Sequence, residues 1–235
     1  MNTIYYIGGI SCAGKSTRVL ALVAYLNSTT IPKEEFNFTD RYGRTKTIGY
    51  LYANKLLIIG KVTMRNNSPA WQGVDAFSNF LQEDLGQPNL YAHIFEWSKK
   101  YSVVLDASLM LRSPWSRPYS TSMHTDAKSV TFMFCADSIE EYAKRLAIRS
   151  DRRVTPESGM WKSNSSFKAH IQHHKEELEQ YKLSALDYEA HLCNINEALC
   201  VIGVSVLKRT FPEHLDGFVD FCVDNADALY HVGAK

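Results

Sequence analysis

Apolar residues along the chain form short continuous runs that alternate with longer stretches of helical spacing. The continuous runs are β-prone, four to six residues long and typical of buried strands, and they occupy residues 3–7, 56–59, 102–106 and 130–135. The stretches with an apolar residue every three or four positions predict amphipathic helices at residues 15–26, 90–99 and 138–149. Strands alternating with helices predict an α/β fold, mainly a parallel sheet with helices on both faces.

The remaining segments refine this outline. Residues 44–52 and 55–62 resemble two strands of a hairpin joined at Ala53-Asn54. Residues 73–85 are expected to form a turn that enters a helix, and residues 150–168 a polar loop. Residues 170–230 are predicted to be helical, with a buried stripe that includes Leu178, Leu192 and Leu199. We therefore expect one domain with its core in residues 1–170 and a helical extension, residues 171–235, packed on it.

Composition limits the classes of protein to consider. The chain has 235 residues, 45% of them apolar, which suits a single α/β domain with insertions. Its five cysteines are scattered and odd in number, so we expect free thiols and a reducing, cytoplasmic location. We also expect no signal peptide and no membrane partner, because no apolar run approaches the roughly 20 residues that span a bilayer.

Residues 9–16, GISCAGKS, match the phosphate-binding pattern G-x-x-x-x-G-K-[ST] completely. The pattern lies between a predicted strand and a predicted helix, where loop N–H groups and the helix dipole together favour an anion. Lys15 is expected to reach the β- and γ-phosphates of ATP, and Ser16 to offer its hydroxyl to Mg²⁺. The residues predicted to bind the nucleotide are Gly9, Ser11, Cys12, Ala13, Gly14, Lys15, Ser16 and Thr17.

Two acidic residues are candidates for the chemistry. Asp106 ends a buried strand, where an acid holds Mg²⁺ in proteins with this loop, although an Asp there can also simply cap the next segment. Asp75 follows Gly73 at a predicted helix start, and it can accept a proton from an attacking hydroxyl or act only as an N-cap. Nearby Trp71 suits either a nucleobase platform or the core.

Basic residues gather in one window of the chain. Residues 144–175 contain eight Lys and Arg but two acidic residues, whereas the whole chain has a net charge of only +1. Arg149, Arg152 and Arg153 precede a loop with Pro156 and Gly159, so residues 144–168 read as a lid whose arginines clamp the transferring phosphate. The alternative is a solvated helix face.

These residues resemble the small P-loop kinases, a group that includes nucleoside, nucleotide and polynucleotide kinases. The resemblance covers roughly residues 1–170 and rests on the loop, Asp106 and the arginine-bearing segment. Residues 73–78, GVDAFS, are similar to a Gly-x-Asp-Ala-Leu-Ser stretch of phage and bacterial members, and the nearest likeness is to phage kinases acting on 5-hydroxymethyluracil in DNA. Many relatives have Glu-Gly or Asp-Arg-Ser where this chain has Asp106-Ala107-Ser108. The sequence therefore leaves open which of Asp75 and Asp106 is the base and which supports the metal.

The resemblance implies a P-loop NTPase fold and an ATP- and Mg²⁺-dependent phosphotransferase. Its expected acceptor is a hydroxyl of a nucleotide or of DNA, foremost 5-hydroxymethyluracil in phage DNA, with host cytoplasm as the location. A base in a duplex must leave the stack to react, and Trp71 or Trp115 is a candidate platform for it. The alternatives are a free nucleoside or nucleotide kinase, and a non-enzymatic or GTPase-like binding module. The last needs an Asn-Lys-x-Asp element, which Asn54-Lys55-Leu56-Leu57 lacks. The oligomeric state stays open.

Overall fold

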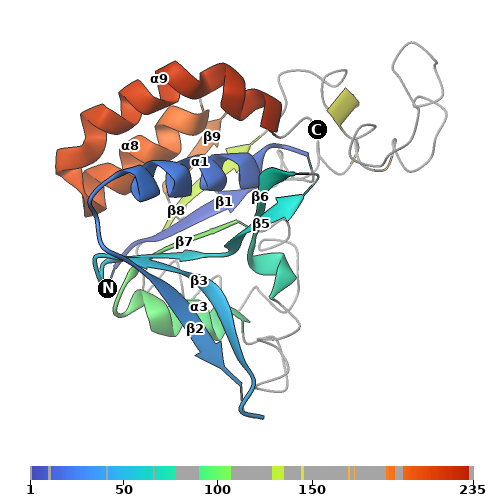
Figure 1. The fold of residues 1–235 in the computed structure, drawn as a ribbon, viewed down its shortest axis with the longest axis vertical. Coiled ribbons are helices and arrows are strands. Elements are labelled where there is room, and N and C mark those ends of the chain that lie inside the picture. Colours follow the sequence, from blue (N-terminus) through green and yellow to red (C-terminus); the bar gives the residue numbers. More distant parts are fainter. Residues whose placement is uncertain are drawn as a thin grey trace.

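The structure is a computed structural model that describes residues 2–9, 12–40, 42–65, 67–77, 90–106, 129–134, 144–145, 169, 172, 189–193 and 198–232. In this part of the chain, seven strands form one sheet in the order β2-β3-β4-β7-β1-β8-β9 (Figure 1). Its strands are β1 (Ile4–Gly8), β2 (Lys33–Thr39), β3 (Thr45–Tyr52), β4 (Leu56–Ile59), β7 (Ser102–Asp106), β8 (Ser129–Phe134) and β9 (Glu189–Cys193). A separate hairpin pairs β5 (Lys61–Arg65) with β6 (Ser68–Gln72).

Helices cover both faces of the sheet (Figure 1). One face carries α1 (Lys15–Ser28), α8 (Ala198–Thr210), the short η3 (Pro212–His214) and α9 (Leu215–Val232). The other carries α3 (Leu90–Ser98) and the 3₁₀ turn η1 (Val74–Ala76). Side chains of a strand point alternately to its two faces, and β1 follows this rule: Tyr5 and Ile7 join the α1 cluster, Ile4 and Tyr6 the α3 cluster. The central strands are therefore apolar on both faces.

The chain order creates a switch point at β1. Strands β4, β7, β1, β8 and β9 run parallel, and β1 lies between β7 and β8. The strands of this sheet that follow β1 in the chain, up to β7, lie on one side of it, whereas β8 and β9 lie on the other side. The register places Ile7 opposite Asp106, so β7 ends beside the loop that leaves β1. Ligands of open α/β sheets bind at the carboxyl ends of the strands at such a point. The predicted loop and the predicted acid thus meet where this rule expects a ligand.

The predicted strands at 3–7, 56–59, 102–106 and 130–135 and the helices at 15–26 and 90–99 are confirmed, as are the α/β class and the parallel centre of the sheet. The predicted helix at residues 138–149, the loop at 150–168 and residues 78–85 of the predicted turn and helix lie outside the described residues except for 144–145. The antiparallel hairpin is also confirmed, with Gly49–Tyr52 paired to Leu56–Ile59. The prediction of helix throughout residues 170–230 is wrong, because residues 189–193 form β9, which pairs with β8 in parallel. Leu192 fits a helical stripe by spacing alone, but pairing with a distant strand decides the conformation of this short run. The domain boundaries stay a prediction.

The β2–β3 hairpin, called the arm below, extends well past the rest of the sheet (Figure 1). One side of β2 is packed by aromatic residues, since the rings of Phe36 and Phe38 lie 5.4 and 6.2 Å from that of Trp97 on α3. The other residues of β2 are exposed, and Tyr42 at the turn is 62% exposed. The arm is therefore held against α3 by two aromatic side chains and is otherwise open to solvent along β2.

Candidate active site

The loop between β1 and α1 has a backbone that few side chains tolerate. Gly9, Cys12 and Gly14 have φ angles of 120°, 66° and 81°. A non-glycine residue such as Cys12 in the left-handed region costs about 1–2 kcal/mol, a strain that collects at functional loops. Alternation between left-handed and helical residues turns successive N–H groups toward one point, which makes an anion-binding concavity. The first turn of α1 contains no acidic residue, so its dipole adds to this effect.

Two basic side chains brace the loop. Lys15 donates from Nζ to the carbonyl oxygen of Gly9 at 2.6 Å, which ties the first residue of α1 to the end of β1. Arg18 is 5% exposed and donates from Nη1 to the carbonyl of Gly14 at 2.7 Å and to that of Ala13 at 3.4 Å. A Cβ on Gly14 would lie 2.0 Å from Arg18 Nη1, so this brace requires glycine there. The guanidinium thus places a fixed positive charge beneath the loop.

Asp106 is the centre of the polar contacts at this edge of the sheet. It is 4% exposed, and its two carboxylate oxygens have different partners. Ser16 Oγ donates to Oδ2 at 3.0 Å, and the Trp71 indole Nε1 donates to Oδ1 at 3.1 Å. Because Trp71 occupies one oxygen, the carboxylate is held with the other toward Ser16. The arrangement places a hydroxyl and a carboxylate oxygen side by side at the start of α1.

Glycine at position 73 is required by close approach. A Cβ there would lie 1.8 Å from Asp106 Oδ1, far inside van der Waals contact. Gly73 leads into η1, whose turn is closed by a hydrogen bond from Ala76 N to Gly73 O at 3.1 Å. The backbone of Asp75 is the middle of this turn, two residues after Gly73, the residue close to Asp106. The side chain of Asp75 lies outside the described residues.

The pair Ser16 and Asp106 suits a hard divalent cation. Mg²⁺ prefers oxygen ligands and is usually bound by one or two carboxylates together with substrate phosphates and water. The two oxygens stand 3.0 Å apart next to the predicted phosphate loop. No group of three or more His, Cys, Asp or Glu able to hold a metal occurs among the described residues. The donor set therefore fits a cation that is completed by a nucleotide better than one held by protein alone.

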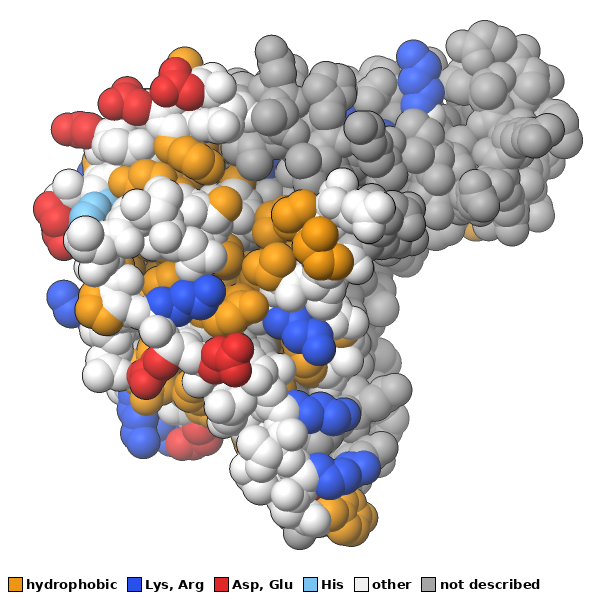
Figure 2. Space-filling view, viewed as in Figure 1, with side chains coloured by type: hydrophobic (Ala, Val, Ile, Leu, Met, Phe, Trp, Pro, Cys, Tyr) orange, Lys and Arg blue, Asp and Glu red, His pale blue; other side chains and the backbone are white. Residues whose placement is uncertain are grey.

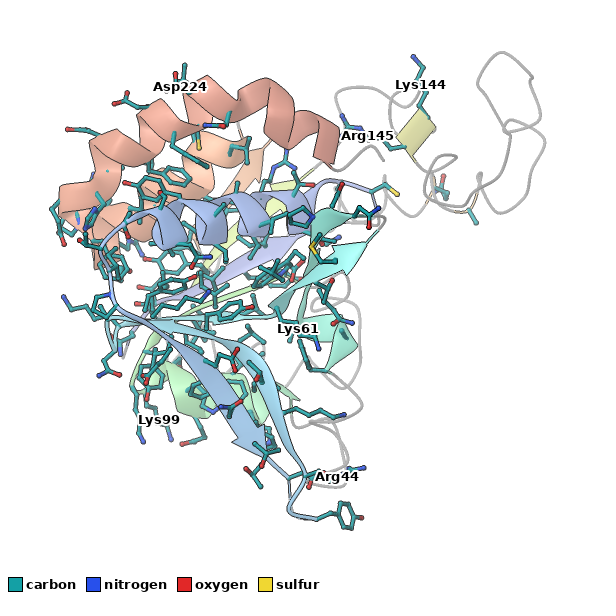
Figure 3. All side chains as sticks on the ribbon, in the orientation of Figure 1. Arg44, Lys61, Lys99, Lys144, Arg145 and Asp224 are labelled. Atoms are coloured by element: carbon teal, nitrogen blue, oxygen red, sulfur yellow. The ribbon has the colours of Figure 1, made fainter. Side chains whose placement is uncertain are left out.

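The structure brings together part of the predicted site. Gly9, Cys12–Thr17 and Asp106 meet at the carboxyl edge of the sheet. The predictions for Ser11, Trp115, Arg149, Arg152, Arg153 and nearly all of the lid fall outside the described residues and stay predictions. Of the lid, Lys144 and Arg145 are described and labelled in Figure 3.

Three site residues have roles that sequence reasoning did not assign. Trp71 is 8% exposed, which favours the core alternative over the nucleobase platform, and its bond to Asp106 adds a positioning role that the sequence did not indicate. The only sequence signal for Arg18 was its position one turn after Lys15. A buried arginine on a helix is unusual, and the structure shows Arg18 to be one. Gly73 stood in the quoted 73–78 segment, but its contact with Asp106 joins residues 33 positions apart.

A polar hollow of about 300 Å³ lies next to this centre. Its walls come from the arm, from β5 and from the residue that follows η1. The lining residues are Glu35, Lys46, Thr47, Tyr50, Lys61, Val62 and Phe77. Two of its lining residues adjoin Trp71, the residue that donates to Asp106: Val62 pairs with Trp71 across the β5–β6 hairpin, and the Tyr50 ring lies 6.4 Å from the Trp71 ring.

The three cysteines that the structure describes fully, Cys12, Cys200 and Cys222, form no disulfide bond, in agreement with the expected thiols. No helix in the described part of the chain combines the length and the apolar character needed to cross a bilayer. The candidate site is therefore defined by the parallel sheet, the braced loop and the contacts of Asp106.

The comparisons with known proteins give one family. No curated protein matches the chain at a significant level. A family model described as "5-hmdU DNA kinase 2" matches residues 1–196 of the 235. This span contains β1 to β9, the loop, Asp106 and the hollow. The chain therefore belongs to the 5-hmdU DNA kinase 2 family, as its resemblance to the hydroxymethyluracil kinases predicted.

Proposed function

We propose that the protein transfers the γ-phosphoryl group of ATP to the hydroxymethyl oxygen of 5-hydroxymethyluracil in DNA, within a P-loop NTPase fold. The observation that carries the proposal is the 3.0 Å contact of Ser16 with the buried Asp106, beside a loop with left-handed residues at 9, 12 and 14. Membership of a DNA kinase family supports the acceptor class. An intact lysine and serine at the start of α1 argue for a working enzyme over a binding module.

In this proposal the loop holds the triphosphate. Its N–H groups and the α1 dipole bind the β-phosphate, while Lys15 exchanges the Gly9 carbonyl for phosphate oxygens. Ser16 and Asp106 hold Mg²⁺, which supplies charge neutralisation on the β- and γ-phosphates. Trp71 keeps the Asp106 carboxylate in place, so its geometry is set before substrate arrives.

The transfer step involves one bond formed and one broken. The hydroxymethyl oxygen bonds to the γ-phosphorus, and the bond from that phosphorus to the β,γ-bridging oxygen breaks, releasing ADP. The hydroxyl proton passes to a carboxylate, for which we propose Asp75 on η1, because Asp106 already accepts two hydrogen bonds. Arg149, Arg152 and Arg153 are proposed to stabilise the charge on the equatorial oxygens.

A labelling experiment tests the proposal. The protein is incubated with γ-labelled ATP and Mg²⁺ alongside hydroxymethyluracil DNA, unmodified DNA, free 5-hydroxymethyldeoxyuridine and its monophosphate. We expect label only in hydroxymethyluracil DNA, and a phosphomonoester on the base after nuclease digestion. Label in the free nucleoside or nucleotide alone would establish the other kinase class. An Asp75→Asn variant should lower kcat by about 10²-fold or more, with little change in ATP affinity. An unchanged kcat would show that Asp75 acts only as a helix N-cap.

A further inference from the structure

The hollow beside Asp106 has a composition that the phosphate loop does not account for. Tyr50 and Phe77 give it aromatic surface, Glu35 and Thr47 give it hydrogen-bonding groups, and Lys46 and Lys61 bring positive charge. Aromatic faces together with a few placed polar groups are typical of sites for small planar ligands. Its volume, about 300 Å³, is at the lower end for such sites, so it suits one nucleotide better than a longer ligand.

The walls of the hollow are held in place. The Tyr50 hydroxyl accepts a hydrogen bond from Val62 N at 3.3 Å, and the Lys33 ammonium lies 4.0 Å from the centre of its ring. The Thr47 hydroxyl oxygen, Oγ1, lies 3.1 Å from Glu35 Oε2 and 2.8 Å from Asn37 Oδ1, and it can donate its proton to either acceptor. The Tyr50–Val62 bond joins the arm to β5, and the other contacts join the two strands of the arm. A planar ligand would therefore meet a surface that is already ordered, which lowers the entropy lost on binding.

The positive charge is arranged along an edge. Lys61 Nζ lies 5.9 Å from the centre of the Phe77 ring, and Lys46 lines the same hollow from β3. Basic side chains gather along this edge of the surface in Figure 2, and Figure 3 places Lys61 beside η1 and Arg44 near the arm tip. Arg44 is half exposed although it pairs with Asp40 at 2.6 Å. Exposed Tyr42 completes the tip of the arm.

We propose that this hollow receives the acceptor nucleotide of a DNA strand, an inference that rests on the proposed function. The unstacked pyrimidine lies against Tyr50 and Phe77, and Glu35 accepts the N3–H of the base. Lys46 and Lys61 contact the phosphates that flank the base, and the strand continues along the arm toward Arg44. A DNA acceptor differs from a free nucleoside because it carries phosphates on both sides of the reacting residue, and the two lysines contact these phosphates in this proposal.

The placement also suits the reaction. Val62 on the wall pairs with Trp71, and Trp71 donates to Asp106, so the hollow borders the centre where the transferring phosphate is expected. Phe77 directly follows η1, which carries Asp75. A base in the hollow would thus lie against the residue that follows the turn carrying Asp75, and it would be linked to the proposed metal site through Val62 and Trp71. Trp71 is buried, so the aromatic contacts of the base are made by Tyr50 and Phe77, which line the hollow.

The test is the salt dependence of DNA phosphorylation by a Lys46→Ala/Lys61→Ala double variant. Each lost phosphate contact lowers the slope of log(kcat/KM) against log[salt] by about one, so we expect a decrease of about two. At 0.1 M salt we expect KM for DNA to rise about tenfold, while the affinity for an ATP analogue stays unchanged. A Lys46→Arg/Lys61→Arg variant, which keeps the charges, should restore the slope. Lys99→Ala, on the opposite edge in Figure 3, is the matched control and should leave the slope unchanged.

The outcomes separate the two proposals. If the unmodified enzyme labels hydroxymethyluracil DNA but the double alanine variant keeps its slope and KM, the hollow is not the acceptor site and the proposed function stands. A double variant that loses ATP-analogue affinity instead assigns the hollow to the nucleotide donor and overturns the inference. If the unmodified enzyme labels no DNA, the proposed function and this inference fall together.

Discussion

Gly73→Ala isolates the role of the Asp106 carboxylate, because it changes one methyl group and no charge. Gly73 has φ −78° and ψ −169°, a conformation that alanine adopts without strain. The new Cβ would stand 1.8 Å from Asp106 Oδ1 and 2.5 Å from its Cγ. Real Cβ contacts begin at about 3.0 Å, so the carboxylate and the turn must separate by more than 1 Å.

The cost follows from the contacts that this shift breaks. A shift of more than 1 Å is large enough to break the bonds from Ser16 and Trp71 to Asp106, which are now 3.0 and 3.1 Å long. Hydrogen bonds to a charged group contribute about 1.5–3 kcal/mol each, and the stiffer unfolded chain returns about 0.4–1 kcal/mol. We expect a net loss of about 2–5 kcal/mol in unfolding free energy. A misplacement of about 1 Å at a catalytic group costs about 10²-fold in rate.

The measurements are thermal unfolding by circular dichroism and kcat/KM for DNA phosphorylation. In a chain of this size, each kcal/mol lowers Tm by about 2–4 °C. Gly217→Ala on α9 is the control, because its Cβ meets the Tyr25 hydroxyl at 3.0 Å, far in the fold from Asp106. It should leave kcat/KM unchanged. The reasoning is refuted if Gly73→Ala keeps kcat/KM within threefold of the unmodified enzyme, since Asp106 would then tolerate displacement.

Three further predictions use other parts of the molecule. Lys15→Ala should lower kcat by about 10²–10³-fold with Tm within a few degrees, as activity assays and melting curves will show, and retained activity would remove the phosphate role. Burial raises the pKa of Asp40, but hydrogen bonds from the Arg44 and Tyr42 backbones and the Arg44 side chain outweigh it and hold the pKa below its ordinary value. Asp40 therefore stabilises the fold above its ordinary pKa of 3.8 and loses this effect as pH falls through the lowered value. Asp40→Asn should flatten the acid limb of Tm against pH below that ordinary value, and an unchanged limb would contradict it. Burial, with a smaller effect of Cys200, raises the pKa of Cys222 to about 12, so iodoacetamide at pH 8 should modify Cys222 only after denaturation, as peptide mass mapping can check.

Local signals in the sequence were enough for the elements that build the loop between β1 and α1. Strand β1, the glycine-rich turn and helix α1 are contiguous, and their apolar spacing reports their conformation directly. The acid at the end of β7 followed from the same logic. Strand β9 did not, since a five-residue run has too little periodicity to distinguish strand from helix, and its partner β8 lies more than 50 positions away.

The roles of individual side chains were still less visible. The bond of Trp71 to Asp106 spans 35 positions and that of Ser16 to Asp106 spans 90. No residue pattern encodes such a meeting, because the parallel register of the sheet produces it. Gly73 was a partial exception. The sequence pointed to its segment, residues 73–78, but only the structure shows why glycine is required there, namely its close approach to the Asp106 carboxylate.

The β5–β6 hairpin links the two proposed sites mechanically. Lys61 and Val62 of β5 line the hollow, and Trp71 on β6 holds Asp106. Gly60 at its start has φ 139°, and a Cβ there would lie 2.2 Å from the Trp71 ring, so the indole is tightly enclosed. A base that enters the hollow therefore meets a wall that cannot shift without disturbing the carboxylate expected to hold the metal. Because packed groups transmit small displacements, we infer that acceptor contacts and metal geometry are set together by this hairpin.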